Sequence, residues 1–498
     1  MAASTPWWSG GDGVLLPPTV MGQVDRTTIV GGIAGIVLME AAGRAVARAV
    51  TAGLPPAPVL VLCGPGNNGG DGYVCARILA DGGWDVRVAT LGDPDALHGD
   101  AAWARSSWRG PVLPLDAALL DRPDIVVDAL FGAGLARDLD GVARAVVERL
   151  DPDRHPVVAV DVPSGVDGAT GQIRGAAPRA TFTVTFCRAK PGHVLLPGRL
   201  HVGELRVADI GIPEAAVAAH DLGLRVNAPG RWLAQLPQRT PEAHKYRFGH
   251  AVVVGGAAHA SGAARMAAAA ALRVGAGLAS VACSAAAAPT YAARLTAVMV
   301  KPFATAHGLH QLLDDERLNA WLIGPGVGVG SDTRSHVEAI LRTRRTAVLD
   351  ADALTSFAGR STELFALLHD RCVLTPHDGE YARLFTHRGD RLSRARTAAM
   401  EAGAVVVLKG ADTVVAAPDG RAVIQPLAPP WLATAGTGDV LAGLILGLLA
   451  QGMSAFDAAA AGVWLHADAA ARHGPAMIAE DLADQLPAAL ASLGECKE

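Results

Sequence analysis

Residues 59–72 read VLVLCGPGNNGGDG, an apolar run followed by a glycine-rich turn that carries two asparagines and an aspartate. A buried parallel strand, a glycine turn and a helix gather backbone N–H groups at one point, where they can bind phosphate. Residues 435–449, AGTGDVLAGLILGLL, repeat the arrangement in the second half, with one carboxylate at the start of an apolar helix. The sequence therefore predicts two anion-binding sites of different chemistry.

The composition is that of a soluble globular enzyme. With 498 residues the chain is too long for one ordinary core, so we expect at least two domains. Half of the residues are hydrophobic, 18% are charged and the net charge is −5. No block of Lys or Arg occurs, which argues against nucleic-acid binding.

Cysteine usage and the apolar segments indicate a cytoplasmic protein. The six cysteines show no CxxC spacing, which argues against a zinc site or a disulfide framework and favours a reducing compartment. They are Cys63, Cys75, Cys187, Cys283, Cys372 and Cys496. Residues 1–22 lack the pattern of a signal peptide. The apolar helix candidate 440–450 is far shorter than the ~20 residues that span a bilayer, so no membrane partner is expected.

Apolar strand candidates alternate with helices in the first half, after an unpatterned start. The predicted strands are 59–62, 86–90, 125–129, 157–160 and 181–186, and the predicted helices are 36–50, 72–80 and 141–150. Continuously apolar strands separated by helices form a parallel sheet that is covered on both faces. We expect a doubly wound, Rossmann-like α/β sandwich that binds its ligand at the carboxyl ends of the strands.

The pattern loosens between residues 211 and 239, where Gly and Pro are frequent. We place a domain boundary near residue 225, so that the predicted domains are 1–224 and 225–498. A second α/β alternation follows at 251–254, 262–274, 278–283, 320–323, 347–349, 373–374 and 405–408, and two helices, 439–451 and 455–471, end the chain. A glycine follows nearly every strand of this half.

The first glycine-rich turn can be interpreted in two ways from its residues alone. Gly64, Gly66 and Gly69 match the G-x-G-x-x-G dinucleotide pattern, but the second strand does not end in the acidic residue that the pattern requires. Asn67 and Asn68 add side-chain oxygens that a plain dinucleotide turn does not need. The alternative is an Asn/Gly turn that binds nothing.

Polar side chains also follow two other predicted strands. Asp128 ends one strand, and Asp161 and Ser164 follow the next, so that these residues and Asn68 meet at one edge of the sheet. Oxygen ligands with few carboxylates suit a monovalent hard cation. Helix N-caps are the alternative, because Asp and Ser are common capping residues.

Four motifs of the first half together resemble the NAD(P)H-hydrate epimerase domain. They are GPGNNGGDGYVCARIL, DALFGAGL, VAVDVPSGVDGATG and TFCRAKPGHVLLPG with GELRVADIGIP, and the resemblance covers about residues 25–213. It implies a potassium ion on Asn68, Asp128 and Ser164. It also implies that a hydrated nicotinamide dinucleotide binds to Asn67, Asn68, Gly69, Gly70, Asp71, Gly132, Ala133, Gly134, Leu135, Ala136, Arg137, Asp138 and Asp161.

Asp161 is the predicted proton-shuttling residue of this domain. Epimerising a carbinol carbon requires a general acid or base beside it. Lys190 is the weaker candidate, because a lone lysine in a loop is more often solvated than catalytic.

Asp439 lies where a helix start and the amides of residues 436–438 can hold phosphoryl oxygens. The positive helix end is expected to keep this carboxylate ionised, and an ionised carboxylate can accept a proton from a hydroxyl that attacks phosphorus. The chain contains no G-x-x-x-x-G-K-[ST] motif, so the site is not a P-loop. A plain helix-start signal is the alternative.

The second half is similar to the ADP-dependent NAD(P)H-hydrate dehydratase domain, a relative of ribokinase. The similarity covers about residues 240–491 and rests on GTGDVLAG with the loops HK, GG, GAA, GPGVG, DADAL, LTPH and KGADT. It implies that Ala263, Gly326, His377 and Asp439 face the hydrated substrate. It further implies that Lys409, Gly410, Ala411, Asp412, Thr413 and Gly438 hold the nucleotide, and that Mg²⁺ bridges the nucleotide phosphates.

One stretch departs from that family. Tyr246-Arg247-Phe248 stands between Lys245 and Gly249, where the family more often has glycine directly after the lysine. If this segment lies near the phosphates, the departure alters that loop.

The two resemblances predict a bifunctional repair enzyme for the hydrates of NADH and NADPH, NADHX and NADPHX. The first domain interconverts the R and S epimers, as an isomerase, and the second dehydrates the S epimer with ADP, as a lyase, giving AMP and phosphate. A homo-oligomer is expected. The alternative is a small-alcohol kinase of the ribokinase type whose first domain binds a ligand without catalysis.

Overall fold

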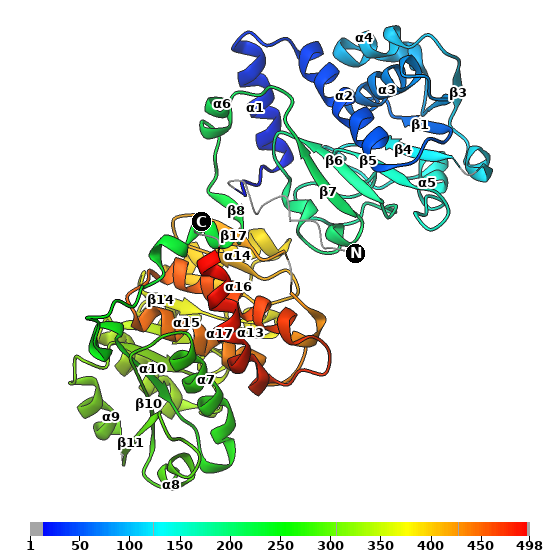
Figure 1. Cartoon of the computed structure of the whole chain (residues 1–498). Coiled ribbons are helices and arrows are strands. Elements are labelled where there is room, and N and C mark those ends of the chain that lie inside the picture. The colour runs from blue at the N-terminus through cyan, green and yellow to red at the C-terminus, as the bar shows by residue number, and fades with distance from the viewer. Residues whose placement is uncertain (1–12, 123, 305, 427, 496–498) are drawn as a thin grey trace. The chain divides into compact units, whose positions relative to one another are not determined.

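The computed structural model describes residues 13–122, 124–304, 306–426 and 428–495, which form two compact units, Met1–Leu224 and Arg225–Glu498 (Figure 1). Cys496 and the first twelve residues, which entered the expectations on cysteines and signal peptides, lie outside the described residues. Among the described helices none combines the length and the apolar character needed to cross a bilayer.

The first unit contains a parallel sheet of seven strands in the order β3-β2-β1-β4-β5-β6-β7. The strands are β1 (Val59–Cys63), β2 (Val86–Thr90), β3 (Val112–Pro114), β4 (Ile125–Ala129), β5 (Val157–Val160), β6 (Phe182–Phe186) and β7 (Glu204–Ala208). The helices are α1 (Pro18–Val30), α2 (Gly35–Gly53), α3 (Asn67–Asp81), α4 (Gly99–Ser107), α5 (Gly141–Val147) and α6 (Glu214–Ala218). The predicted doubly wound α/β fold is confirmed, and the start that the sequence left unpatterned contains α1.

Alternate residues of β1 pack on opposite faces of this sheet. Val59 and Val61 belong to a core that α2, α3 and α4 cover, whereas Leu60 and Leu62 belong to a core that α5 covers. Both faces are buried, as continuous apolar strands require.

Helix α3 begins at Asn67, five residues before the predicted start at Gly72. The glycines of this turn allow a close approach of backbone that side chains would prevent. A Cβ on Gly69 would collide with the Gly64 carbonyl oxygen, and a Cβ on Gly72 would lie 2.7 Å from the Ala129 Cβ atom. Asn67, Asn68 and Asp71 therefore belong to the first turns of a helix that starts at the carboxyl end of β1.

The second unit contains a mixed sheet of ten strands in the order β11-β10-β9-β12-β13-β14-β15-β16-β17-β8. The strands are β8 (Leu224–Val226), β9 (His250–Val254), β10 (Leu278–Ser284), β11 (Met299–Phe303), β12 (Ala320–Ile323), β13 (Thr346–Leu349), β14 (Cys372–Leu374), β15 (Val405–Leu408), β16 (Val414–Ala416) and β17 (Ala422–Ile424). The strands from β11 to β15 are parallel, and β15, β16 and β17 are antiparallel. This is a ribokinase-like α/β fold.

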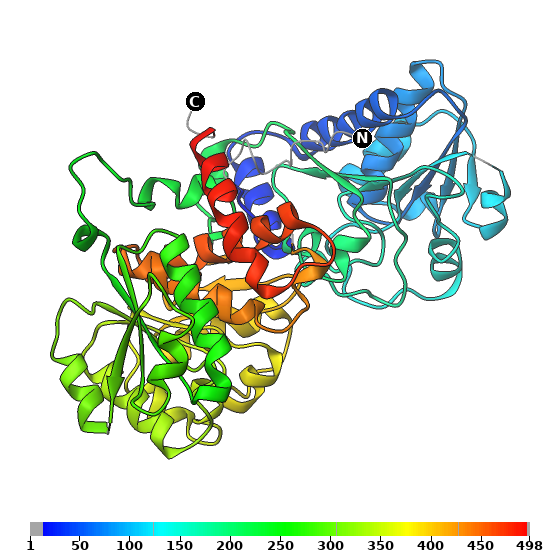
Figure 2. The ribbon, with the colours of Figure 1, turned by 60° about the horizontal axis from the view of Figure 1, so that its bottom comes forward.

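Helices α7 (Ser261–Arg273), α15 (Thr437–Ala450), α16 (Ala455–His473) and α17 (Ala479–Glu495) share one core with this sheet. In Figure 2 the green α7 lies beside the orange α15 and the red α17. The remaining helices are α8 (Ala288–Ala292), α9 (Ala306–Leu313), α10 (Ser331–Arg342), α11 (Asp352–Thr355), α12 (Ser361–Phe365), α13 (Asp378–Leu384) and α14 (Arg391–Ala402). The described chain thus ends in three helices rather than the two predicted, because α17 follows α16.

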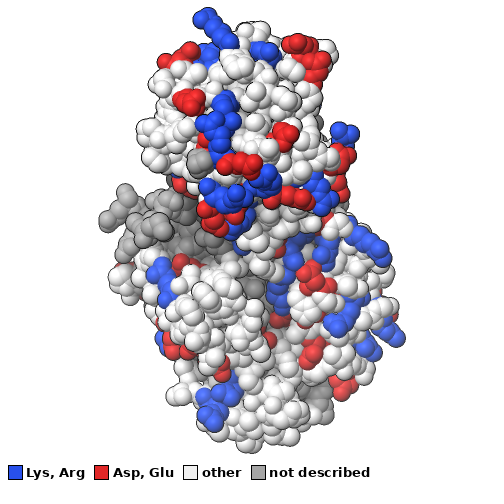
Figure 3. Space-filling model, turned by 90° about the vertical axis from the view of Figure 1, so that its right-hand side faces the viewer, with Lys and Arg blue, Asp and Glu red and all other residues white. Residues whose placement is uncertain are grey.

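Charged side chains of opposite sign stand next to one another on the face that Figure 3 shows. Ion pairs between neighbouring side chains occur in the first unit, where Arg149 pairs with Asp121 and Arg179 pairs with Asp151 and Asp153. Such neutralised surfaces lack the single-sign field that attracts nucleic acid.

Candidate active sites

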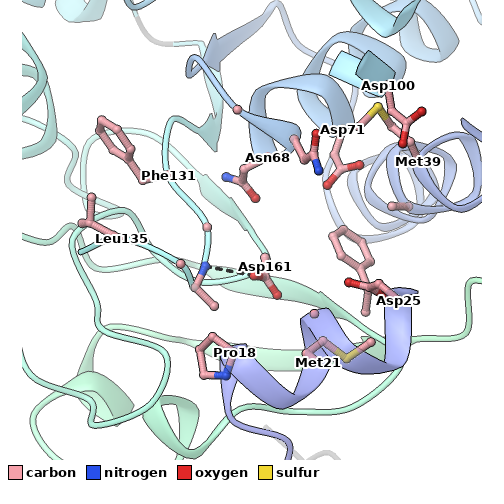
Figure 4. A pocket seen from close by; sticks show the side chains of 18 of the residues that line it. Pro18, Met21, Asp25, Met39, Asn68, Asp71, Asp100, Phe131, Leu135 and Asp161 are labelled. Atoms are coloured by element: carbon pink, nitrogen blue, oxygen red, sulfur yellow. Dashed lines mark hydrogen bonds between the residues drawn. The ribbon is translucent and has the colours of Figure 1, made fainter. Parts of the chain in front are cut away.

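A cavity of about 740 Å³ lies at the carboxyl ends of the strands of the first unit (Figure 4). Of the predicted substrate-binding residues, Asn67, Asn68, Asp71, Gly132, Ala133, Gly134, Leu135, Ala136, Arg137 and Asp161 line it. Gly69, Gly70 and Asp138 are not among its lining residues. Gly70 serves packing instead, since a Cβ there would lie 2.7 Å from the Met39 Cε atom.

Asp161 follows β5 and projects into the cavity together with Asp25 of α1 and Asp71 of α3 (Figure 4). Its φ angle is +65°, a conformation that is strained for a residue other than glycine and that clusters at functional sites. The Asp161 Oδ2 atom accepts a hydrogen bond of 3.0 Å from the Ala133 backbone N–H. The loop after β4 and the end of β5 therefore meet at this carboxylate.

Lys190 is buried against Asp161, contrary to the expectation that it is solvated. Its Nζ atom lies 2.6 Å from Asp161 Oδ1, and its side chain is 3% exposed. The same Nζ donates to Thr185 Oγ1 at 2.8 Å, and that hydroxyl donates to Asp161 Oδ1 at 3.0 Å. The motif TFCRAKPGH already contained both residues, but only the fold brings them to β5.

The carboxyl groups of this cavity have opposite pKa shifts. Burial opposes the charge of Asp161, but Lys190 and the hydrogen bond from Ala133 lower its pKa to about 2. Burial raises the pKa of Asp71 well above its ordinary value, and the carboxylates of Asp161 and Asp25 add to this shift. Burial also raises the pKa of Asp25, which the sequence did not single out. Carboxyls whose pKa values are pushed apart are typical of acid–base sites.

Asp128, in β4, and Ser164, which follows β5, contact one another, and both are fully buried. The Ser164 hydroxyl donates to Asp128 Oδ1 at 2.6 Å, and the Ser164 N–H donates to Oδ2 at 2.8 Å. The amide of Asn68 has a buried Nδ2 atom without a described hydrogen-bond partner. A buried carboxylate that no described cationic side chain pairs, with a serine hydroxyl oxygen beside it, fits a monovalent cation.

The second site lies at the carboxyl ends of four neighbouring strands of the ten-stranded sheet. Gly326 follows β12, Asp350 follows β13, His377 follows β14 and Lys409 follows β15. Ala263 of α7 approaches Gly326, since a Cβ on that glycine would lie 3.7 Å from the Ala263 Cβ atom. The predicted residues therefore converge from distant parts of the sequence.

Lys409 links these strands to the start of α15. Its Nζ atom lies 2.7 Å from Asp350 Oδ1 and 3.8 Å from Glu380 Oε2. A Cβ on Gly438 would lie 3.5 Å from the same Nζ atom. Although burial opposes its charge, Asp350 and Glu380 raise the pKa of Lys409, so a cation stands beside the helix start.

Asp439 is less acidic than the sequence predicted. Burial, with the nearby Asp350 carboxylate, raises its pKa to about 6, and Lys409 only partly offsets the shift. The positive end of α15 does not keep the pKa of Asp439 low. Lys409 offsets little of the rise, because its Nζ atom is paired with Asp350 at 2.7 Å. The carboxyl can thus gain and lose a proton near neutral pH.

Arg391 contacts the predicted nucleotide loop, and the sequence analysis did not identify it. It donates to the Lys409 carbonyl oxygen at 2.9 Å and pairs with Asp412 at 2.9 Å. Within the loop, the Thr413 hydroxyl donates to the Gly410 carbonyl oxygen at 2.8 Å, and Ala411 completes the turn. Arg391 belongs to α14, which carries no motif.

His377 caps α13. Its Nδ1 atom accepts hydrogen bonds from the N–H groups of Gly379 and Glu380 at 2.9 and 3.2 Å, and its Nε2 atom lies 3.4 Å from Glu380 Oε1. The side chain remains 56% exposed, so it is accessible to a ligand.

The departure at 246–248 lies beside the last residue of α15, whereas Asp439 lies in the first turn of that helix. The residues form a short 3-10 helix, Lys245–Phe248, that precedes β9. A Cβ on the following Gly249 would collide with the carbonyl oxygen of Ala450, the last residue of α15. Asp439 lies at the other end of that helix, about 17 Å from Ala450 along the helix axis at 1.5 Å per residue.

Comparison with known proteins covers both units. The profile of NAD(P)H-hydrate dehydratases matches residues 251–488, and that of the YjeF-related protein N-terminus matches residues 35–192. The bifunctional NAD(P)H-hydrate repair enzyme Nnr of Moorella thermoacetica is 40% identical over 517 positions, covering 97% of both chains. That of Salinibacter ruber is 39% identical over 520 positions, covering 95% of this chain and 96% of the relative.

A solved structure is also similar to the second half. The ADP/ATP-dependent NAD(P)H-hydrate dehydratase of Bacillus subtilis, co-crystallised with ATP and Mg²⁺, is 28% identical with a TM-score of 0.47, covering 54% of this chain and 98% of that protein. The full-length relatives and the two profiles are sufficient to assign the family. This chain belongs to the family of bifunctional NAD(P)H-hydrate repair enzymes.

Proposed function

We propose that this chain repairs the hydrates of NADH and NADPH with two active sites, an epimerase in residues 1–224 and an ADP-dependent dehydratase in residues 225–498. The observation that carries the proposal is the pair of carboxylates Asp161 and Asp439, each at the carboxyl end of a sheet and near a lysine, Lys190 buried and Lys409 partly buried. The full-length relatives, which carry both activities in their name, support it. A ribokinase-type kinase does not explain the first site. The cytoplasmic location and the homo-oligomeric state stay predictions.

In the epimerase, Asp161 exchanges a proton with the C6 hydroxyl of the bound hydrate. The two predicted loops, from Asn67 to Asp71 and from Gly132 to Asp138, bind the dinucleotide through those of their residues that line the cavity. Asn68, Asp128 and Ser164 would hold K⁺, whose charge would compensate the buried Asp128 carboxylate.

In the dehydratase, Asp439 takes the proton of the C6 hydroxyl while the hydroxyl oxygen attacks the terminal phosphorus of ADP. The phosphorus–oxygen bond to AMP breaks, and the nucleotide loop from Lys409 to Thr413, with Gly438, orients the leaving group. The C6–O bond then breaks and its electrons leave with phosphate, while the lone pair of the ring nitrogen forms a double bond to C6. Loss of a C5 proton restores the dihydronicotinamide. Mg²⁺ would neutralise phosphate charge beside Asp350 and Glu380, whose carboxylates suit it.

The stoichiometry of the reaction tests this proposal. NADPHX and ADP are supplied with Mg²⁺ and K⁺, and NADPH, AMP and phosphate are quantified by chromatography. Equal amounts of the three products are expected. A phosphorylated product that accumulates without NADPH would instead support a kinase.

A further inference from the structure

Most hydrogen-bond acceptor positions of the Asp161 carboxylate are filled by protein donors, and one remains for a substrate. Oδ1 accepts from Lys190 Nζ at 2.6 Å and from Thr185 Oγ1 at 3.0 Å. Oδ2 accepts from the Ala133 N–H at 3.0 Å and faces Gly132 on the cavity wall, where a Cβ would lie 3.2 Å away. Since each carboxylate oxygen has two lone pairs, Oδ2 keeps one acceptor position that no described residue fills.

Lys190 directs its protons to the protein rather than to the cavity. Its Nζ atom donates to Asp161 Oδ1, to Thr185 Oγ1 at 2.8 Å and to the Phe186 carbonyl oxygen at 3.4 Å. An ammonium group has three donors, and these contacts use them all. Lys190 therefore acts through Asp161 and does not itself donate to the substrate.

His193 holds the strained main chain of Asp161. Its Nδ1 atom accepts from the Lys190 backbone N–H at 2.9 Å, so its proton is on Nε2, which donates to the Asp161 carbonyl oxygen at 2.8 Å. Burial and the charge of Lys190 lower the pKa of His193 to about 4, which keeps this tautomer neutral. The Asp161 N–H donates to the Val184 carbonyl oxygen at 2.8 Å, so the φ of +65° is held on both sides.

We infer that Lys190, Thr185 and His193 are positioning residues of the epimerase, which orient Asp161 so that Oδ2 alone exchanges a proton with the substrate. The inference rests on the proposed function. Oδ2 takes the proton of the C6 hydroxyl while the C6–N1 bond breaks with its electrons on N1 and C6 becomes a carbonyl carbon. N1 then re-forms that bond on the opposite face of the carbonyl and Oδ2 returns the proton to the oxygen, so the two epimers have the same atoms and electrons. No described contact of Oδ1 needs to break during this exchange.

Matched variants of the full chain test the inference with the R epimer of NADPHX as substrate, without ADP, by following the S epimer chromatographically. Thr185→Val removes the hydroxyl, whereas Thr185→Ser keeps it. His193→Phe removes both ring contacts, whereas His193→Gln can accept from Lys190 N–H and donate to Asp161 O. Lys190→Met removes the charge.

We expect Thr185→Val, His193→Phe and Lys190→Met to lower kcat about 10- to 100-fold with KM nearly unchanged, because orientation of a general base governs the chemical step. Thr185→Ser and His193→Gln are expected to stay within about threefold of the wild type. Equal losses within either pair, or a loss carried by KM, would overturn the inference. The Thr185 pair keeps the test valid if Lys190→Met does not fold.

Asp161→Asn separates this inference from the proposed function. If Asp161→Asn epimerises like the wild type, the proposed role of Asp161 is wrong. If Asp161→Asn is inactive while Thr185→Val and His193→Phe are normal, only the positioning inference fails.

Discussion

Asp161 and Asp439 each have a lysine nearby, yet the pKa of the first is about 2 and that of the second about 6. The two pKa values differ because the two lysines form ion pairs with different carboxylates. Lys190 pairs with Asp161 itself at 2.6 Å, whereas Lys409 pairs with Asp350 and leaves Asp439 beside a second carboxylate. Asp161 is therefore stabilised as an anion, and Asp439 is poised to take a proton.

The two Asp→Asn variants are therefore expected to change stability in opposite directions. Because the pKa of Asp439 is raised to about 6 in the folded chain, its ionisation destabilises the fold. This destabilisation is complete above pH 6 and absent below the unfolded pKa of 3.8. Asp439→Asn should raise the melting temperature by a few degrees at pH 7.5 and leave it unchanged near pH 4. With its pKa lowered to about 2, Asp161 stabilises the fold above 3.8, and this stability is lost as the pH falls through 2. Asp161→Asn should thus lower the melting temperature at pH 7.5, because Lys190 stays buried without its partner.

Thermal unfolding of the ligand-free chain, at pH 7.5 and pH 4, measures both effects. A lower melting temperature for Asp439→Asn at pH 7.5 would contradict the raised pKa of this group.

At the scale of elements, α15 positions Asp439 because it is buried along nearly its whole length and packs closely on α7. Gly443 makes this approach possible, since a Cβ there would lie 2.6 Å from the Ala267 Cα atom of α7. The helix and its first turn therefore depend on a residue with no role in chemistry.

Gly443→Ala should destabilise the chain by about 1–3 kcal/mol, because the added methyl overpacks a filled core. Gly494→Ala is the matched control, since that helical glycine is exposed and a Cβ there meets nothing within 4 Å. The control should be neutral or slightly stabilising, by up to about 1 kcal/mol, since alanine favours the helix. Denaturant unfolding of both variants measures the difference, and equal stabilities would refute the packing argument.

The sequence predicts best the elements whose burial is uniform. Strands β4 and β5 have the predicted bounds, because each is buried along its whole length between two covered faces. Strand β7 was missed because its residues are exposed or half-buried. The start of α3 was misplaced because glycines, which weaken helices, are needed there for close backbone approach.

The candidate sites follow the same rule. Residues that directly follow a strand, such as Asp161 and Lys409, could be predicted, because parallel strands end at one edge of a sheet. Thr185, His193 and Arg391 could not, because their contacts depend on which strands and helices are neighbours in space.

At the scale of the whole molecule, the two units are expected to divide one repair task. A dehydratase that accepts one epimer leaves the other unrepaired, and an epimerase on the same chain supplies the missing configuration. If the first unit only bound a ligand, the R epimer would be repaired no faster than it epimerises unaided.

Recovery of nicotinamide absorbance from a mixture of R and S NADPHX tests this account most directly. The full chain is supplied with Mg²⁺, K⁺ and ADP, beside Asp161→Asn and a control without nucleotide. We expect the wild type to restore nearly all of the absorbance rapidly, and Asp161→Asn to restore only the S fraction rapidly. Complete rapid recovery by Asp161→Asn, or no nucleotide-dependent recovery by the wild type, would contradict the account.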